Sequence, residues 1–495
     1  MAEVEITAPN GIKWSQPLGL FINGEWVSSS EGKTIPTVSP VTEQEIAAPQ
    51  AASADDVDKA VKAARAAFKN PTWKNTTGAE RAKLLNKFAD LVEKNADILA
   101  AAEALDSGKP FLGPRSFDVP FSHDVIQYMA GWADKLNGTA VNVGPTRIAY
   151  TIKTPVGVVG QIIPWNFVVG SFCMKLAPAL ACGNTVVIKL SEICPLPGLY
   201  LAKLVQEAGF PPGVVNVING YGYDTGAAVV SHAGVDKISF TGSTATAKAI
   251  IKASANNIKR ITLETGGKSP AVIFDDADID SAAVFTHRGI MSYAGQMCFG
   301  NSRIFVQEKV YEEFLEKFKA QLSTVSVLGD PFEATTFQGP LISKAQYDRV
   351  LGYVKIAKEE GATVYLGGTS PPAGNKGFYV QPTVFTDVKP TMRIFQEEIF
   401  GPCVVVVPFK TEEEALELAN DSIYGLSSSI YTNNVSRAHR LAREFEAGNV
   451  YINGPNFPDV KVPFGGVKQS GIGSENGEEG LEPFYTVKAV HVHLG

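Results

Sequence analysis

The feature that most constrains the fold is an alternation of short β-branched runs with helical stretches between about Pro155 and Phe274. The run TVVIKL precedes the helical GLYLAKLVQEAGF, GVVNVI follows, and KISFTG leads into the helical TATAKAIIKASANN. Strand–helix alternation of this kind is typical of a parallel sheet with helices on its faces. The sequence therefore predicts an α/β fold in this region.

The same pattern restarts in the second half of the chain, where SPAVIF, SRIFVQ and CVVVVPF have the composition of strands. Helical stretches accompany them: VYEEFLEKFKAQL, a long helix around Tyr347–Glu360, and EEEALELAND. Because 495 residues exceed one ordinary hydrophobic core, we expect two major α/β domains. The terminal segment TVKAVHVHL alternates strictly, which predicts a strand that pairs across a subunit boundary.

The first third of the chain predicts a hairpin and two helices. FINGEWV contains an Asn-Gly turn between apolar residues, which favours a hairpin. Ser53 can cap a helix over DDVDKAVKAARAAFK, and a second helix is expected from Arg81 to Ser107, closed by Gly108 and Lys109.

The charge pattern excludes several classes of partner. The formal net charge is -7, with both signs interspersed, whereas nucleic acids and anionic membranes favour a basic surface. No stretch approaches the roughly 20 apolar residues that span a bilayer. The N-terminus MAEVEITAPNG contains no Arg and shows no presequence, so a cytoplasmic location is expected. The five Cys form no C-x-x-C pair, so no metal site is predicted.

Three residues are candidates for catalysis, each with a simpler alternative. Cys298 in YAGQMCFG is either a packing residue or a nucleophile, since the thiolate attacks electrophiles. Glu264 in ITLETGGKSP either caps the next segment or acts as a general base whose pKa is raised by apolar walls. Asn166 in QIIPWNFVVG either stabilises a turn or donates to an oxyanion.

Two further motifs favour a nucleotide. Lys189 and Glu192 follow the strand TVVI directly, and ligands of α/β sheets collect at the carboxyl ends of strands. A carboxylate there can accept both ribose hydroxyls of NAD and would repel the extra phosphate of NADP. FTGST places Gly242 and Ser243 at a helix N-terminus, which suits a pyrophosphate. A lysine at a solvated strand end remains the alternative for Lys189.

Taken together and in order, these motifs resemble one family. QIIPWNF, VIKLSE, FTGST, LETGGKSP, GQMC, EEIFGP and PFGGVKQSG follow the motif series of the aldehyde dehydrogenase superfamily, from about Phe21 to the C-terminus. The resemblance implies an aldehyde dehydrogenase fold: a modified doubly wound NAD-binding domain, an α/β catalytic domain and a small oligomerisation hairpin. The implied boundaries are 1–133 and 154–263, then 264–474, then 134–153 with 475–495.

The resemblance also implies roles for individual residues. The catalytic set is Cys298 as nucleophile, Glu264 as general base, Asn166 as oxyanion donor, and Lys175 and Glu475 as a proton relay. The implied cofactor-binding residues are Ile162, Ile163, Pro164, Trp165, Lys189, Ser191, Glu192, Gly222, Gly226, Phe240, Gly242, Ser243, Thr246, Thr265, Gly266, Glu398 and Phe400. The implied substrate pocket comprises Phe167, Gly170, Met174, Ser292, Met297, Phe299 and Phe464.

The implied activity is oxidation of a small-molecule aldehyde to a carboxylic acid with NAD(P)+, through a thiohemiacetal and a thioester on Cys298. Glu192 favours NAD and leaves NADP as the alternative. Many relatives carry large aliphatic, aromatic or Cys side chains where Gly170, Met174, Ser292 and Phe299 stand here, which predicts either a tunnel for a bulky or aromatic aldehyde or neutral repacking. Alternatives are an enzyme for an imine-like biosynthetic intermediate, an acyl-coenzyme A-forming dehydrogenase, and a catalytically retired binding protein. A homo-oligomer, dimer or tetramer, is expected.

Overall fold

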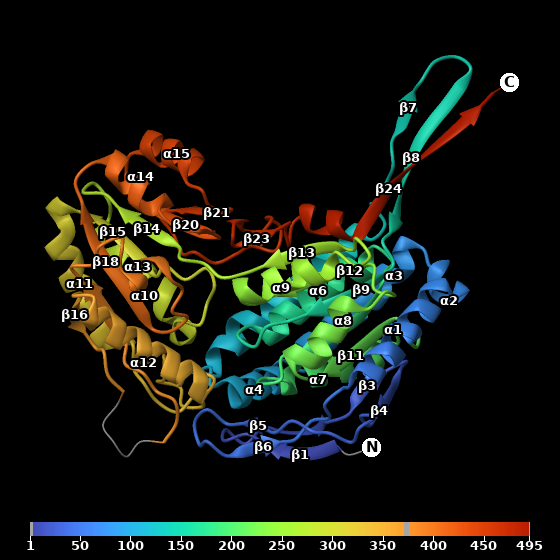
Figure 1. Ribbon diagram of the computed structural model, residues 1–495, viewed down its shortest axis with the longest axis horizontal. Coiled ribbons are helices and arrows are strands. Elements are labelled where there is room, and N and C mark those ends of the chain that lie inside the picture. Colours follow the sequence, from blue (N-terminus) through green and yellow to red (C-terminus); the bar gives the residue numbers. More distant parts are fainter. Residues whose placement is uncertain (1–2, 371–375, 495) are drawn as a thin grey trace.

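The structure is a computed structural model that describes residues 3–370 and 376–494, and it contains two α/β units side by side with a ribbon that projects from one of them (Figure 1). Each unit is built on a sheet flanked by helices, as the alternating sequence pattern predicts. The α/β fold class is therefore confirmed. No helix among the described residues is long and apolar enough to cross a membrane.

The sheet of the first unit has eight strands in the order β23-β13-β12-β9-β10-β11-β3-β4. The strand bounds are β3 Leu20–Ile22, β4 Glu25–Val27, β9 Val158–Ile162, β10 Thr185–Leu190, β11 Val215–Asn219, β12 Lys237–Thr241, β13 Arg260–Glu264 and β23 Gly471–Ile472. Strands β9 to β13 are all parallel, and the chain moves outward from β9 in one direction and then from β12 in the other. This reversal makes the sheet doubly wound and creates a crevice at the carboxyl ends of β9 and β12.

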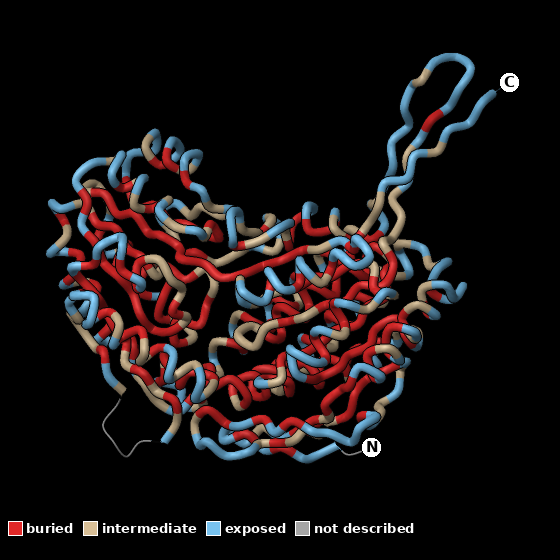
Figure 2. Tube along the Cα trace, in the orientation of Figure 1, coloured by how far each residue is buried: buried red, intermediate tan, exposed pale blue. Residues whose placement is uncertain are grey.

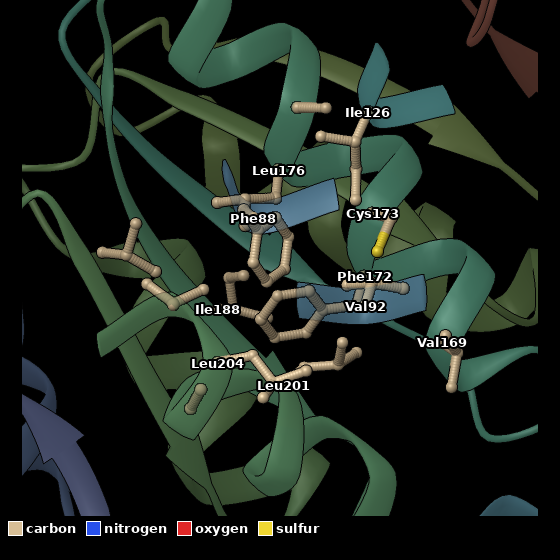
Figure 3. Packing of buried hydrophobic residues seen from close by; sticks show 14 of the residues in the cluster. Phe88, Val92, Ile126, Val169, Phe172, Cys173, Leu176, Ile188, Leu201 and Leu204 are labelled. Atoms are coloured by element: carbon tan, nitrogen blue, oxygen red, sulfur yellow. The ribbon is translucent and has the colours of Figure 1, made fainter. Parts of the chain in front are cut away.

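Helices cover both faces of this sheet (Figure 1). Their bounds are α1 Ala54–Lys69, α2 Pro71–Lys74, α3 Gly78–Lys94, α4 Ala96–Ser107, η1 Pro114–Asp118, α5 Val119–Trp132, α6 Val168–Ala181, α7 Leu196–Ala208, η2 Gly222–Gly226, α8 Ala227–Ser231, α9 Thr244–Ser254 and η5 Glu479–Phe484. In Figure 3, Phe172, Cys173 and Leu176 of α6 lie among apolar side chains of other helices and of β10. This buried helix carries Lys175 toward the site described below.

The N-terminal predictions are confirmed with one correction. Strands β3 and β4 form the expected hairpin, with Asn23 at φ 55° and Gly24 at φ 81°, the left-handed conformation that a tight Asn-Gly turn requires. Ser53 caps α1 in a capping box. The single helix expected from Arg81 to Ser107 is wrong: it breaks at Asn95, whose side-chain amide donates to Leu91 O (2.8 Å) and terminates α3.

The second unit has a seven-stranded sheet in the order β16-β17-β18-β15-β14-β20-β21. The strands are β14 Pro270–Ile273, β15 Arg303–Gln307, β16 Thr363–Leu366, β17 Thr383–Thr386, β18 Cys403–Phe409, β20 Ser427–Tyr431 and β21 Asn449–Ile452. Its helices are α10 Ile279–Met291, η3 Ser292–Gly295, η4 Glu308–Val310, α11 Tyr311–Val325, α12 Lys344–Glu359, α13 Arg393–Gln396, α14 Glu412–Asn420 and α15 Val435–Glu444. All pairings are parallel except that of β16 with β17, and the predicted strands and helices are confirmed.

A three-stranded antiparallel ribbon projects from the first unit (Figure 1), and most of its residues are exposed (Figure 2). It consists of β7 Ala140–Asn142, β8 Arg147–Pro155 and β24 Tyr485–His493, in the order β24-β8-β7. One edge of β24 therefore pairs with β8 of the same chain. Pairing across a subunit boundary stays a prediction for the other edge.

The chain returns to the first unit before it enters this ribbon. Strand β23 pairs with β13, and Leu481 and Phe484 are buried in the first unit's core. Among the described residues 475–494, β24 belongs to the ribbon, whereas Leu481 and Phe484 belong to the first unit. Three short pairs complete the fold: β1 Glu3–Thr7 with β2 Lys13–Pro17, β5 Thr37–Val38 with β6 Glu45–Ala47, and β19 Tyr424–Gly425 with β22 Val467–Lys468.

Candidate active site

A cavity of about 230 Å³ lies between the two units, at the carboxyl ends of β9, β12 and β13. Ten of its thirteen lining residues belong to the predicted site: Pro164, Trp165, Asn166, Gly242, Ser243, Thr265, Gly266, Cys298, Glu398 and Phe400. The other three, Thr241, Gln346 and Arg349, were not predicted. The fold therefore joins candidate catalytic and cofactor-binding residues in one cavity.

Cys298 differs from the other thiols in its access to this cavity. It is partly exposed, whereas Cys173, Cys182, Cys194 and Cys403 are buried. Burial, with the neighbouring carboxylates of Glu398 and Glu264, raises the pKa of the Cys298 thiol. The resting thiol is therefore protonated, and it needs a base before it can act as a nucleophile.

Glu264 ends strand β13 with its side chain inside the protein, and the residue is 3% exposed. Neither carboxylate oxygen has a hydrogen-bond partner among the described residues. Burial and the Glu475 carboxylate raise its pKa, while Lys175 opposes the shift. An unpaired buried carboxylate is costly for folding and well suited to accept a proton, so the general-base interpretation is favoured over a cap.

Lys175 and Glu475 form a buried ion pair next to Glu264. The Lys175 ammonium, on α6, also contacts Ser239 Oγ on β12 at 3.4 Å. Because Glu475 shifts the pKa of Glu264, the three groups are electrostatically linked. The ion pair therefore belongs to the same electrostatic cluster as Glu264.

Asn166 lies in the turn between β9 and α6 and lines the cavity beside Cys298. Its amide Nδ2 donates to Gln296 O (2.9 Å), two residues before the thiol. This bond ties the candidate oxyanion donor to the loop that carries the nucleophile.

The residues expected to hold the adenosine ribose gather where β10 ends. Lys189 Nζ lies 2.7 Å from Glu192 Oε2, and Gly222 N donates to Glu192 Oε1 (3.3 Å). Burial opposes ionisation of Glu192, but the Lys189 ammonium and these hydrogen bonds hold its pKa below the usual value. Glu192 is therefore an anion. Ser191 is buried in the same turn, whereas Gly226 lies at the far end of η2.

The N-terminus of α9 supplies the second part of a nucleotide site. Ser243 Oγ accepts from Thr246 N (3.1 Å), and the helix has eleven residues, so its dipole favours an anion at this end. Gly242 lies against the Phe240 ring, where a Cβ would approach within 2.5 Å. Ile162 and Ile163 close β9 next to this turn.

A third cluster faces Cys298 across the cavity. Burial raises the pKa of Glu398 to about 7, although Gly267 N donates to its Oε1 (3.0 Å). A Cβ on Gly266 would lie 2.3 Å from Glu398 Oε2, so this glycine makes room for the carboxylate. Phe400 meets Trp165 edge to face with 5.4 Å between ring centroids. Acidic and aromatic groups here fit a nicotinamide ribose and its ring.

Next to Asn166, aromatic rings form a continuous cluster. The ring centroid of Phe121 lies 5.8 Å from that of Phe167 and 5.6 Å from that of Phe117. The ring centroid of Phe457 lies 5.1 Å from that of Phe117 and 6.3 Å from that of Phe299. The cluster continues from Phe299 to Phe464 at 6.1 Å.

Only half of this aromatic cluster was predicted. Phe167, Phe299 and Phe464 were predicted for the substrate pocket, whereas Phe117, Phe121 and Phe457 were not, since they belong to other segments of the chain.

The small size of Gly170 suggests open space in the substrate pocket, but the Phe167 ring occupies the space beside it. A Cβ there would lie 2.0 Å from the Phe167 ring, so the ring itself fills the space on α6. Met174 is buried on the same helix, Met297 is buried before Cys298, and Ser292 begins η3. Gly170 therefore makes room for the Phe167 ring, and the predicted tunnel shape stays a prediction.

A larger cavity of about 800 Å³ lies at the base of the ribbon and contains none of the predicted site residues. Its one thiol, Cys182, is buried, unlike the partly exposed Cys298. Among the described residues there is no cluster of three side chains that could hold a metal ion.

The chain is similar to known proteins over nearly its whole length. The sequence model described as "Aldehyde dehydrogenase family" matches residues 26–490. An aldehyde dehydrogenase of Emericella nidulans is 49% identical over 98% of this chain and 97% of its own length. A Saccharomyces cerevisiae relative named as an NAD(P)+ aldehyde dehydrogenase is 47% identical over 98% of this chain and 96% of its own. The NAD+ complex of a Bacillus cereus aldehyde dehydrogenase superposes with a TM-score of 0.95 at 46% identity, covering 97% of each chain.

Proposed function

This chain belongs to the aldehyde dehydrogenase family and is an NAD(P)-dependent enzyme that oxidises aldehydes, and we propose that Cys298, Glu264 and Asn166 carry the reaction. The observation that supports this most strongly is the buried Glu264 carboxylate, which has no hydrogen-bond partner among the described residues and whose charge helps to raise the pKa of the partly exposed Cys298 thiol. Such a group is costly to fold and is explained by proton transfer.

We propose the following sequence of steps. Glu264 takes the proton of the Cys298 thiol, and the thiolate sulfur bonds to the aldehyde carbon. Asn166 Nδ2 and the backbone N–H of Cys298 donate to the resulting oxyanion. Bound NAD(P)+ supplies the acceptor for the hydride that leaves the thiohemiacetal carbon, which turns the adduct into a thioester.

Release of the acid needs a second proton transfer. Glu264 passes its first proton to the Glu475 carboxylate, paired with Lys175, and is again a base. It then deprotonates water, whose oxygen attacks the thioester carbon and displaces the Cys298 sulfur. This use of a carboxylate base supports the free carboxylic acid as the product, and not an acyl-coenzyme A.

The three clusters around the cavity fit the parts of a dinucleotide, and NAD is the cofactor we propose. Glu192 would accept the adenosine ribose hydroxyls, the α9 N-terminus would bind the pyrophosphate, and Glu398 with Phe400 would hold the nicotinamide ribose. The preference for NAD follows from the negative charge of Glu192, which would repel a ribose 2′-phosphate. On this assignment the first unit binds the adenosine ribose and the pyrophosphate, and the second supplies the nucleophile and the contacts to the nicotinamide ribose.

The aromatic cluster supports an aryl aldehyde as the preferred substrate. Rings that meet edge to face or offset add about 0.5–1.5 kcal/mol beyond the area they bury, so an aryl group bound against Phe167 and Phe299 would be favoured over acetaldehyde by about tenfold in kcat/KM. Comparing benzaldehyde with acetaldehyde under the same conditions tests this. A higher kcat/KM for acetaldehyde would overturn the proposed substrate class and leave the catalytic assignment intact.

The catalytic assignment is tested by Cys298→Ser. We expect no reduced cofactor above background from the variant, because the serine hydroxyl is a far weaker nucleophile. Cys173→Ser, in the buried cluster of Figure 3, is the matched control and should keep the parent turnover per active site. Turnover by Cys298→Ser at the parent rate would exclude the mechanism.

The projecting ribbon supports a homo-oligomer. Ile148, Ile152 and Val487 are exposed on it, and β24 is an edge strand among the described strands. Exposed apolar strands with an open edge favour association. Light scattering on the full chain and on an Ile152→Lys variant tests this, since the proposal requires the variant to dissociate.

A further inference from the structure

A buried ion triad lies outside the site described so far. Lys109, which follows α4, places its Nζ 2.7 Å from Glu103 Oε1 on α4 and 2.7 Å from Asp118 Oδ2 at the end of η1. All three side chains are at most 3% exposed. Buried charges are expensive to desolvate and contribute little net stability, so such a triad calls for a reason other than stability.

One carboxylate of the triad reaches the segment that carries Asn166. Glu103 Oε1 accepts from Val168 N (3.1 Å), at the first residue of α6 and two residues after Asn166. The Lys109 ammonium lies 5.5 Å from the centroid of the intervening Phe167 ring. Glu103 and Lys109 therefore hold the two residues that follow Asn166, the candidate oxyanion donor.

The other carboxylate reaches the loop that carries Cys298. The Tyr293 hydroxyl donates to Asp118 Oδ1 (2.7 Å), and the Lys109 ammonium lies 4.5 Å from the Tyr293 ring centroid. Tyr293 and Ala294 have φ of 51° and 55°, a left-handed conformation that non-glycine residues adopt only when their surroundings enforce it. The phenol anchor at Asp118 is one such constraint.

The two connections meet again at the cavity. Gln296 N donates to Tyr293 O (3.2 Å), Gln296 Nε2 contacts the same oxygen at 3.2 Å, and Gln296 O accepts from Asn166 Nδ2 (2.9 Å). A closed circuit of contacts thus runs from Lys109 through the Asn166 segment and the Cys298 loop back to Lys109.

We propose that the Lys109–Glu103–Asp118 triad is a positioning centre that sets the distance between the Asn166 amide and the Cys298 sulfur. Lys109 lies over the ring of the predicted pocket residue Phe167, and the two carboxylates act through Val168 and Tyr293. The inference rests on the proposed function, because it assigns the triad a role in the step where the thiohemiacetal oxyanion forms and hydride leaves. Donors misplaced by a fraction of an ångström lose much of their effect on such a step.

The test is Tyr293→Phe, which keeps the ring beside Lys109 and removes only the hydroxyl that binds Asp118. We expect the single-turnover rate of reduced-cofactor formation to fall about tenfold, the effect of losing one hydrogen bond to a charged group. The dissociation constant of NAD+ should stay within about twofold of the parent value, since the hydroxyl that is removed binds Asp118 and not a residue assigned to the cofactor. Tyr379→Phe is the matched control: it removes a half-buried hydroxyl that donates to Gly329 O (3.1 Å), and it should leave the rate unchanged.

A second variant, Glu103→Gln, tests whether the triad acts as a unit. It should slow the same step, and the double variant should be slower by clearly less than the product of the two single effects, because both changes disturb one centre. Single-turnover rates of the folded variants equal to the parent rate, with only a lower melting temperature, would show a purely structural role. A double variant whose rate falls by the full product of the two single effects would also show that the triad does not act as a unit. If Cys298→Ser kept its activity, the proposed function itself would fail, whereas a Cys298-dependent enzyme indifferent to Tyr293→Phe would refute the positioning role alone.

Discussion

Replacing Glu264 by Gln should make the protein more stable and less active at the same time. The substitution preserves the shape of the side chain and removes its charge. In the structure the residue is 3% exposed, and both carboxylate oxygens are without hydrogen-bond partners among the described residues. An unpaired buried polar group costs about 1–3 kcal/mol, and a charged one more. A buried amide retains part of this cost. We therefore expect the free energy of unfolding of Glu264→Gln to exceed that of the parent by about 1 kcal/mol at any pH where the parent carboxyl is ionised.

The stability difference should depend on pH with a defined sign. Burial raises the pKa of Glu264 in the folded protein above its ordinary value of 4.5. Below pH 4.5 the carboxyl is protonated in both the folded and the unfolded chain, so its ionisation does not lower the free energy of unfolding. As the pH rises toward and through the raised folded pKa, the unfolded chain releases its proton first, and the folded state loses stability relative to it. The advantage of Glu264→Gln therefore grows from acid to alkaline pH.

The loss of activity should be confined to the steps that need a base. General-base catalysis contributes about 10²–10⁴-fold, so steady-state turnover of Glu264→Gln should fall by that factor. If thioester hydrolysis is the slower of the two proton-transfer steps in the variant, the first turnover should appear as a burst of reduced cofactor.

The assay is thermal unfolding at pH 5 and pH 9, together with rapid-mixing and steady-state kinetics. Glu359→Gln is the matched control, because this exposed glutamate on α12 lies near Lys355 (3.7 Å) and its replacement should change stability by less than about 0.5 kcal/mol at either pH. Equal unfolding temperatures for parent and Glu264→Gln at pH 9, or undiminished turnover, would refute the assignment of a strained catalytic base.

Three other changes have expected outcomes. Glu192→Gln should raise kcat/KM for NADP+ about tenfold relative to NAD+, measured as a ratio, because a repelling charge worth about 1.4 kcal/mol is lost. Gly266→Ala should lower kcat at least about tenfold, measured at saturating NAD+. Its Cβ would lie 2.3 Å from Glu398 Oε2, so the carboxylate would have to move away. Gly170→Ala should push the Phe167 ring aside and cost about 1–3 kcal/mol in denaturant unfolding, and it should lower kcat/KM for benzaldehyde more than for acetaldehyde.

Local patterns predict the strands and helices well because their causes are local. The run TVVIKL is buried along its whole length as β10, and β-branched residues suit that position. The break between α3 and α4 was missed because Asn95 is tolerated inside a helical pattern, and only its bonds to Leu91 and to Tyr200 on α7 make it a terminus. Pairing of β23 with β13 was missed for a similar reason, because two residues within a glycine-rich segment carry no periodicity.

The residues of the site likewise fall into two groups: those that motifs in the sequence predict, and those that only the packing of the two units brings to the cavity. Cys298, Glu264 and Asn166 each have a simpler interpretation when taken singly, and only the ordered series of motifs indicates their roles. Arg349 and Gln346 reach the cavity from α12, a helix whose sequence shows only amphipathic spacing. The spacing cannot reveal which polar face of a helix meets a cavity built by strands 80 or more residues away, and only the packing of the two units decides this.

The raised pKa of Cys298 changes how the choice of nucleophile is explained. Burial raises the pKa of all five thiols, so low acidity does not separate Cys298 from the four buried cysteines. What separates it is that the cavity gives its sulfur access to a substrate and that Glu264 can take its proton. A thiol kept protonated until a base and a substrate meet it also reacts slowly with oxidants, since the thiolate is the species that oxidises. Of the two carboxylates that help to raise this pKa, Glu264 is also the base that we propose removes the proton.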